Sequence, residues 1–193
     1  MKAPRLIVLA GPNGSGKSTF FEAHLRTLGL DFVNADRVVA ALGIPANEAA
    51  EAADALRGQF VAERKSYITE TVFSDPVGAK LQLLRDAIAA GYEVTLLYIG
   101  LASPALSEAR VAQRVADGGH DDPPERLARR YAQSLQNLVT TLRFVPEVLV
   151  FDNSSSETPH RLVLSARNGV VRKEVSPLPP WLKCALPPSG AGR

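Results

Sequence analysis

The spacing G-x-x-x-x-G-K-[ST], which runs from Gly11 to Ser18, constrains the fold of this chain more than any other feature. The apolar, partly β-branched residues before it predict a buried strand over Arg5–Ala10. A helix is predicted to begin near Lys17 and to stop at Gly29. The glycines permit backbone angles that let successive N–H groups point at one anion, which also faces the positive end of the helix. The sequence therefore predicts a strand, a phosphate-binding loop and a helix in direct succession.

This loop has the spacing of a nucleotide-binding P-loop. Lys17 is expected to reach the β- and γ-phosphates and to assist catalysis, and Ser18 is expected to ligate Mg²⁺. A Gly-rich turn that only joins a strand to a helix is the plain alternative, but the predicted strand and helix flank the loop on the correct sides. The expected nucleotide-binding residues are Gly11, Pro12, Asn13, Gly14, Ser15, Gly16, Lys17, Ser18 and Thr19.

The composition is that of an ordinary globular protein. The 193 residues are 46% hydrophobic and 22% charged, and this length suits one α/β domain, predicted over residues 1–175 with its core over 5–155. No apolar run approaches the length of a membrane span and no secretory leader is recognisable, so a cytoplasmic protein without membrane contact is expected. The net charge of +2 is too small to indicate a nucleic-acid surface, and the single cysteine, Cys184, excludes an internal disulfide.

Apolar strands alternate with amphipathic helices up to about residue 152. This alternation predicts an α/β class, the P-loop NTPase fold, with a five-stranded parallel sheet and helices on both faces. The predicted strands are Arg5–Ala10, Phe32–Ala35, Tyr67–Thr71, Glu93–Ile99 and Glu147–Phe151.

Further helices are predicted from about residue 47 to 65, after Asp75-Pro76, after Ser103-Pro104 and from Pro124. Two of the predicted helices carry apolar residues at helical spacing, which are expected to face the core. These residues are Phe21, Leu25 and Leu28 in the helix after the P-loop, and Leu127, Tyr131, Leu135, Leu138 and Leu142 in the helix from Pro124.

The pattern changes near the C-terminus. Asn168-Gly169 lies between two short apolar runs and predicts a β-hairpin over residues 161–175, expected as a small appendage. The tail, residues 176–193, contains five of the 14 prolines and is expected to be extended or disordered. Trp181 in this tail is expected to dock on the domain.

Acidic residues follow two of the predicted strands. In open α/β sheets ligands collect beyond the carboxyl ends of the strands, where Asp36 and Glu70 are expected to lie. Asp36 is the candidate base that accepts the proton of an acceptor hydroxyl, and helix capping is its alternative role. Glu70, with Thr71 beside it, is the candidate for holding the acceptor or, through water, the metal. Asp152 ends the fifth strand, where it is equally suited to start a turn.

Arginines cluster between residues 110 and 130. Arg110 and Arg114 lie four residues apart on one predicted helix, and Arg126 and Arg130 repeat this spacing on the next. The segment between them, "GGHDDPPE", suits a hinged lid that brings arginines over the phosphates. Arg114 and Arg130 are the candidate catalytic arginines and Arg126 the candidate nucleotide ligand, with Arg129 as an open alternative and solvated helix faces as the plain one.

The nucleotide base is expected to be adenine. No N-K-x-D segment is present to read guanine, so ATP with Mg²⁺ is the expected cofactor pair. The polar segment "DNSSS", residues 152–156, is placed where it could approach the adenine, and Asn153 is its candidate ligand. A plain turn explains this segment nearly as well.

Six segments in this order carry a family resemblance: "GPNGSGKSTF", "VNADRV", "ITETVFS", "ARVAQRVADGGHDDP", "RRYAQSLQNL" and "FDNS". Over about residues 5–155 the chain resembles the zeta toxin family of P-loop kinases, in its compact branch. The resemblance implies a phosphotransferase that modifies the 3′-hydroxyl of the amino sugar in UDP-N-acetylglucosamine and is held off by an antitoxin protein. It also implies a P-loop lysine at Lys17, a catalytic aspartate at Asp36, a substrate-binding glutamate at Glu70, and phosphate-clamping arginines at Arg114 and at Arg126 or Arg130.

The sequence therefore predicts an ATP- and Mg²⁺-dependent kinase of a small hydroxyl-bearing acceptor, with a UDP-amino sugar as the leading candidate. Another metabolite, an antibiotic or a polynucleotide 5′-hydroxyl is the alternative acceptor. A nucleotide-binding regulator, with Trp181 and the tail as its partner contact, is the alternative outside the enzymes. A departure from the compact branch, Asp122 before the proline of the "GGH" loop, bears on the acceptor rather than on the kinase chemistry.

Overall fold

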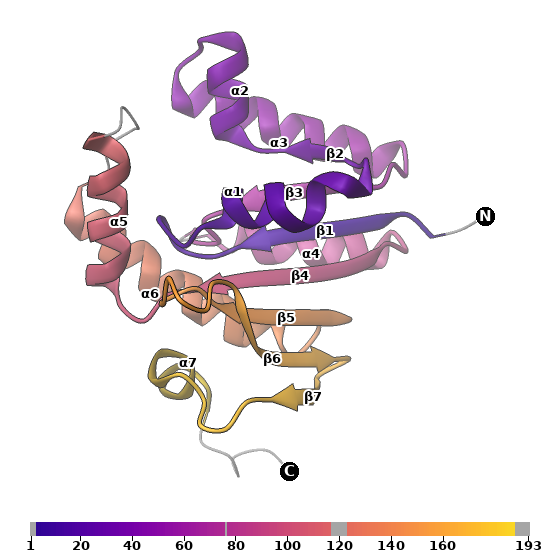
Figure 1. The fold of residues 1–193 in the computed structure, drawn as a ribbon. Helices are drawn as coiled ribbons and strands as arrows, with labels where there is room; N and C mark the ends of the chain where they lie inside the picture. The colour runs from indigo at the N-terminus through magenta and orange to yellow at the C-terminus, as the bar shows by residue number, and fades with distance from the viewer. Residues whose placement is uncertain (1–2, 76, 117–122, 188–193) are drawn as a thin grey trace.

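The computed structural model describes residues 3–75, 77–116 and 123–187. One sheet runs through the molecule in the strand order β2-β3-β1-β4-β5-β6-β7 (Figure 1). The strands are β1 (Arg5–Ala10), β2 (Asp31–Val33), β3 (Tyr67–Thr71), β4 (Glu93–Gly100), β5 (Glu147–Asp152), β6 (Arg161–Arg167) and β7 (Val170–Glu174).

The first five strands are parallel, as the sequence predicts. β1 and β3 have the predicted bounds, and β4 and β5 each extend one residue further. β2 begins one residue earlier than predicted. It also ends earlier, because the Asn34 side chain caps the next helix by accepting a hydrogen bond from the Arg37 backbone N–H at 3.1 Å. The chain therefore leaves the sheet at Val33.

The C-terminal hairpin is part of the sheet, so the expectations of a small appendage and of only five strands were wrong. β6 pairs antiparallel with β5, and β7 pairs antiparallel with β6. The side chains of Val163, Leu164 and Ala166 are buried in the main core. The hairpin thus completes the core beside β5, while β7 forms an exposed edge.

Helices lie on both faces of the sheet (Figure 1). They are α1 (Lys17–Phe20), α2 (Ala35–Leu42), α3 (Ala46–Ala62), α4 (Ala79–Ala89), α5 (Pro104–Ala116), α6 (Pro124–Thr141) and α7 (Pro180–Ala185). α1 continues as a π-helical turn, η1 (Phe21–Leu25), and a 3₁₀ turn, η2 (Arg26–Leu28). No helix in the described part of the chain is long and apolar enough to cross a membrane.

Alternation along the strands separates two cores. Leu6, Val8 and Ala10 of β1 face the larger core, to which α3, α4, α6 and α7 contribute, whereas Leu9 faces a smaller core built on α1 and η1. Of the α6 stripe, Leu127, Tyr131 and Leu138 are buried, and Leu135 and Leu142 pack partly buried against the larger core. Leu28, expected in the smaller core, is 41% exposed because the π-helical turn shifts the phase of the helix after Phe20.

The start of the tail is folded rather than extended. α7 docks through Trp181, which is 6% exposed, and through Leu182, which is fully buried. A Cβ atom on Gly100 would lie 2.2 Å from the Trp181 ring, so the indole packs directly on the backbone at the end of β4. The Trp181 indole N–H also donates to Asp152 Oδ1 at 3.2 Å. The predicted docking of Trp181 is therefore confirmed, and the prediction of an unfolded segment fails for residues 180–185.

Replacement of Trp181 by alanine tests whether α7 is integral to the fold. Because the buried indole fills the notch over Gly100, we expect Trp181→Ala to lower the free energy of unfolding by about 3–5 kcal/mol. Urea denaturation followed by far-UV circular dichroism measures this change, with the exposed Lys183→Ala of the same helix as control. A loss below about 1 kcal/mol would show that α7 docks only loosely.

Candidate active site at the carboxyl ends of the parallel strands

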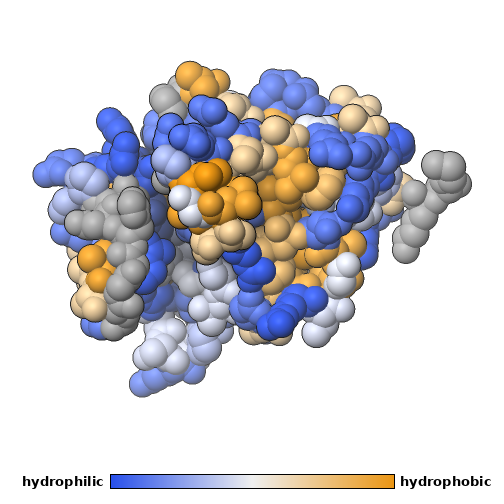
Figure 2. All heavy atoms as spheres, turned by 90° about the horizontal axis from the view of Figure 1, so that it is seen from above, coloured by the Kyte–Doolittle hydropathy of each residue, from blue (hydrophilic) through white to orange (hydrophobic). Residues whose placement is uncertain are grey.

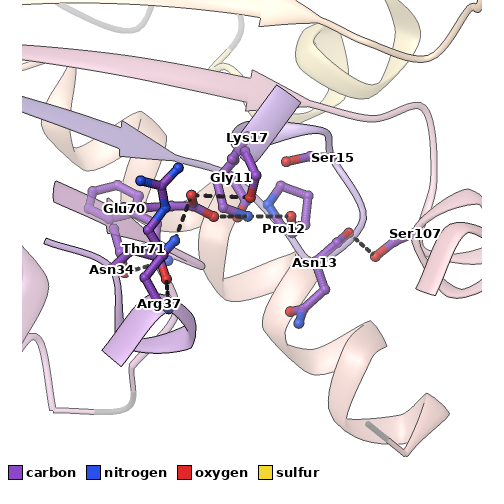
Figure 3. Close-up of polar contacts among 12 residues, drawn as sticks. Gly11, Pro12, Asn13, Ser15, Lys17, Asn34, Arg37, Glu70, Thr71 and Ser107 are labelled. Carbon is purple, nitrogen blue, oxygen red and sulfur yellow. Dashed lines mark hydrogen bonds and ion pairs between the residues drawn. The ribbon is translucent and has the colours of Figure 1, made fainter. Parts of the chain in front are cut away.

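The P-loop joins β1 to α1 and folds back over the side chain of Lys17. The Lys17 ammonium group donates to the carbonyl oxygens of Gly11 and Pro12, each at 3.0 Å (Figure 3). Gly16 has a φ of 85°, in the left-handed region that side chains disfavour, and a Cβ there would lie 2.5 Å from Asn153 Nδ2. Glycine is therefore required at this position for both conformation and space.

Charges of both signs converge on Lys17. Burial lowers the pKa of the Lys17 ammonium group, and the positive charge of Arg114 lowers it further. The carboxylates of Glu70 and Asp36 oppose this effect and raise the pKa. The starts of α1 and α2, the end of β3 and the last turn of α5 thus bring these four groups into one electrostatic neighbourhood.

Glu70 is tied to the P-loop by both carboxylate oxygens. Glu70 Oε1 lies 3.9 Å from Lys17 Nζ, and Glu70 Oε2 accepts from Ser18 Oγ at 3.4 Å. Asn34 Nδ2 donates to the same Oε2 at 2.8 Å (Figure 3). The register of β1 and β3, which pairs Leu9 with Glu70, places this acid at the mouth of the loop.

Asp36 lies in the first turn of α2 and is exposed. Asn34 caps this helix, so the alternative role of Asp36 as the cap is wrong. The Asp36 carboxylate is consequently free of the capping role while remaining close enough to Lys17 to raise its pKa.

The loop has a feature suited to an anion. The Ser15 hydroxyl is completely buried and has no hydrogen-bond partner among the residues that the structure describes. A buried donor without an acceptor is costly, and a phosphate oxygen would supply the acceptor. The glycine-lined loop, the buried Lys17 and the N-terminus of α1 therefore fit a nucleotide phosphate.

The other predicted ligands of this region divide into exposed and locally bonded side chains. Ser18 and Thr19 are exposed at the start of α1. The Ser18 hydroxyl contacts Glu70, so Ser18 and Glu70 could share a metal ion. Thr71 Oγ1 accepts from the Phe73 backbone N–H at 3.0 Å, which ties it to the turn after β3. The Asn13 backbone carbonyl accepts a hydrogen bond from the Ser107 hydroxyl at 2.7 Å, which anchors the loop to α5.

Asn153, the candidate adenine ligand, supports the P-loop in this structure. Its side-chain N–H donates to the Ser15 carbonyl at 2.9 Å, and its side-chain oxygen accepts from the His160 backbone N–H at 3.2 Å. Only 8% of the residue is exposed. Both ends of the amide are thus engaged with protein, which leaves little of it to bind a base.

The predicted arginines lie on α5 and α6, at the carboxyl ends of the strands (Figure 1). The positive charge of Arg114 lowers the pKa of Lys17. Arg110 instead donates to the Ser154 carbonyl at 3.4 Å and so contacts the loop after β5. Arg126 is exposed and Arg130 is partly buried. Residues 118–122 of the predicted lid loop lie outside the described residues, and its last two residues, Pro124 and Glu125, begin α6.

Sequence reasoning missed the residues that align the strands beneath the site. Arg57 of α3 is 6% exposed, and its Nε donates to Thr69 Oγ1 at 2.8 Å. The Thr69 hydroxyl donates to the Val33 carbonyl at 3.1 Å, which couples β3 to β2 just before Glu70 and Asn34. Asn34 was visible in "FVNA" before an acidic helix start, a capping signal, but nothing local marked the partner of Arg57.

The parallel sheet, the P-loop and the acids beyond the strands define a P-loop nucleotide-binding protein with a kinase-type fold. A protein-family model described as an AAA domain, AAA_33, matches residues 6–138, well over half of the chain. The chain therefore belongs to this family. No curated protein matches the sequence significantly.

Several solved structures have similar folds at low sequence identity. A chain in the crystal structure of AvrRxo1-ORF1:AvrRxo1-ORF2 with sulphate ions is 17% identical, with a TM-score of 0.70, over 98% of this chain and 66% of that one. A structure of the PezAT toxin–antitoxin system of Streptococcus pneumoniae is 16% identical, with a TM-score of 0.65, over 86% and 72%. A protein of Chloroflexus aurantiacus provisionally designated a kinase is 18% identical, with a TM-score of 0.59, over 82% and 90%.

The chain spans just under two thirds of the AvrRxo1 chain, 66% of its length. Another crystal structure of that complex, which has a TM-score of 0.57 to this chain, contains ATP. These likenesses confirm the expected P-loop kinase fold.

The role of Asn153 as a P-loop support is testable. Because Asn153→Ala removes the donor to the Ser15 carbonyl, we expect ATP to bind about tenfold more weakly, equivalent to roughly one hydrogen bond. Calorimetric titration with a non-hydrolysable ATP analogue measures the affinity. Ser155→Ala, an exposed change in the same loop, is the matched control. Equal affinities for both variants would contradict the support role.

His160 beside the loop predicts a pH dependence of stability. Burial lowers the pKa of His160, so its contribution is complete above the unfolded-state pKa, about 6.5, and is lost as the pH falls through the folded-state pKa. His160 has a φ of 52°, which asparagine tolerates. We expect the melting temperature to fall less between pH 7 and pH 5 in His160→Asn than in the wild type. Parallel curves would contradict the prediction.

Proposed function

We propose that this protein is an ATP-dependent phosphotransferase that transfers the γ-phosphoryl group to a hydroxyl of a small acceptor. The observation that carries the proposal is the buried Lys17 ammonium group, held by two P-loop carbonyl oxygens with Glu70 Oε1 at 3.9 Å, near enough to Asp36 and Arg114 for their charges to affect its pKa. A phosphate site by itself needs only the loop and its lysine. Transfer of a phosphoryl group to a hydroxyl also requires acidic groups and a positive charge, which Glu70, Asp36 and Arg114 supply.

In the proposed reaction the acceptor hydroxyl oxygen forms a bond to the γ-phosphorus as the bond from that phosphorus to the β–γ bridging oxygen breaks. ADP leaves, and the Asp36 carboxylate takes the hydroxyl proton. Lys17, Arg114 and Arg130 stabilise the negative charge on the transferring group, and Arg126 holds the nucleotide. The exposed position of Asp36, free of the capping role, supports its assignment as the base.

Mg²⁺ is the proposed metal, held by Ser18 and, directly or through water, by Glu70. When bound, it neutralises charge on the β- and γ-phosphate oxygens. The contact between Ser18 Oγ and Glu70 Oε2 supports a shared metal site, because both are the oxygen ligands that Mg²⁺ prefers. Glu70 is thereby a better candidate for the metal than for the acceptor, with Thr71 remaining an acceptor candidate.

UDP-N-acetylglucosamine is the proposed acceptor, on the strength of the resemblance to the zeta toxin family. An antitoxin protein is the corresponding proposed partner, supported by the fold similarity to a structure from a toxin–antitoxin system. The cytoplasm is the proposed location of the reaction. ATP as phosphoryl donor is supported by a similar fold solved with ATP.

Asp36→Asn tests the reaction and the base together. Since the amide cannot take the hydroxyl proton, we expect kcat for phosphorylation of UDP-N-acetylglucosamine to fall by roughly 10²–10⁴-fold, with ATP binding retained. Intact-mass detection of the sugar product measures the gain of one phosphoryl group. Asp31→Asn, an exposed acid in β2, serves as the control.

Other results would redirect the proposal. ADP formation that does not respond to the sugar would refute this acceptor and point to another hydroxyl compound. A polynucleotide acceptor would show steep loss of activity with salt, whereas a nucleotide sugar would show little. ATP binding without any turnover, with biological function retained in Asp36→Asn, would instead indicate a nucleotide-dependent regulator.

A further inference from the structure

α2 carries the proposed base yet none of its side chains is buried. Its last apolar residue, Leu42, is 65% exposed. The view onto the side of the molecule where α2 lies shows hydrophobic atoms at the surface among hydrophilic ones (Figure 2). No side chain of α2 is anchored in the core, so its position depends on its packing against α3 and on specific contacts at its start.

The contacts at the start of α2 come from two residues that flank Asp36. Asn34 caps the helix and donates to Glu70, which fixes the point where the chain leaves β2. Arg37 forms an ion pair with Glu22. Its guanidinium carbon also lies 4.9 Å from the ring centroid of Phe21 and 4.7 Å from that of Phe32.

The surface that receives Arg37 contains two packed aromatic rings. The rings of Phe21 and Phe32 stack at 3.8 Å with an interplanar angle of 12°. Phe21 is buried, and both Phe21 and Glu22 belong to η1, the direct continuation of the helix that starts at Lys17. Arg37 therefore connects α2 to the helix that follows the P-loop, through stacking and an ion pair together.

We propose that Arg37 is a positioning residue, which holds α2, and with it Asp36, at the correct place relative to the P-loop. The inference rests on the proposed function, because it assigns Arg37 to the placement of the proposed base. Asn34 fixes the start of the helix, and Arg37 fixes its direction against η1. A displacement of about 1 Å at a reacting group costs up to roughly 10²-fold in rate, so such a residue affects kcat without touching the reactants.

The chain offers a matched control for this contact. Arg26 forms an ion pair with the same carboxylate, Glu22, at 3.0 Å, but it lies in η2, and among the described residues no direct contact joins it to α2. Arg26→Ala therefore removes one positive charge next to Glu22 without changing the attachment of α2. Arg37→Met keeps an apolar stem of similar length and removes the guanidinium.

The experiment compares kcat and KM for ATP and for UDP-N-acetylglucosamine in the wild type and in four variants: Arg37→Met, Glu22→Ala, their combination, and Arg26→Ala. We expect Arg37→Met to lower kcat about tenfold or more with both KM values within about twofold. Glu22→Ala should lower kcat part of the way. The double variant should be no worse than Arg37→Met, because both changes break one connection. Arg26→Ala should leave kcat within about twofold.

Two results would overturn the positioning role. A rise in the KM for the sugar with unchanged kcat in Arg37→Met, and no effect of Glu22→Ala, would show that Arg37 binds the acceptor directly. Equal kcat losses in Arg26→Ala and Arg37→Met would show a general effect of charge near Glu22.

Hydrogen exchange tests the same contact without any activity. Val38 donates to the Asn34 carbonyl at 3.1 Å and Gly43 to the Val39 carbonyl at 2.8 Å, so the amides of α2 report on its attachment. We expect faster exchange in α2, but not in α6, in Arg37→Met and not in Arg26→Ala. Unchanged exchange in α2 would refute the tether. If the wild type phosphorylates no acceptor, the proposed function is refuted. If exchange in α2 is nevertheless faster in Arg37→Met than in Arg26→Ala, the attachment of α2 by Arg37 still holds.

Discussion

The buried ammonium group of Lys17 sets the arrangement of the site, because a cation removed from water must be surrounded by oxygen atoms. Two of these oxygens come from the P-loop itself and one from Glu70. Glu70 in turn engages Ser18 and Asn34, and Asn34 begins the helix that carries Asp36. The site is thus a chain of polar contacts that starts at one charge and ends at the proposed base.

The P-loop is also held by hydrogen bonds from residues outside the loop. Asn153 binds the Ser15 carbonyl from the end of β5, and Ser107 binds the Asn13 carbonyl from α5. Asp152, next to Asn153, receives the indole N–H of Trp181. The C-terminal helix therefore belongs to the same contiguous network as the nucleotide site, although Trp181 is far from the loop in sequence.

Sequence patterns predicted the secondary-structure elements that are determined by residues close together in the sequence. The bounds of β1 and β3 and the hairpin turn at Asn168-Gly169 follow from apolar runs and turn residues within a few positions. The pairing of that hairpin with β5, and the notch at Gly100 that accepts Trp181, depend on segments distant in sequence, so local patterns do not contain them. The same limit applies to the site: the motif revealed Lys17 and Ser18, while the partners of Asn153 and Arg57 emerged only from the folded chain.

The packing environment of Trp181 has a practical consequence for spectroscopy. This is the single tryptophan of the chain, and its indole is packed on Gly100 with its N–H on Asp152. Indole emission shifts with the polarity and hydrogen bonding of its surroundings. Excitation at the red edge of the indole band, where nucleotides absorb little, would therefore record rearrangements behind the P-loop as they occur, without an attached dye.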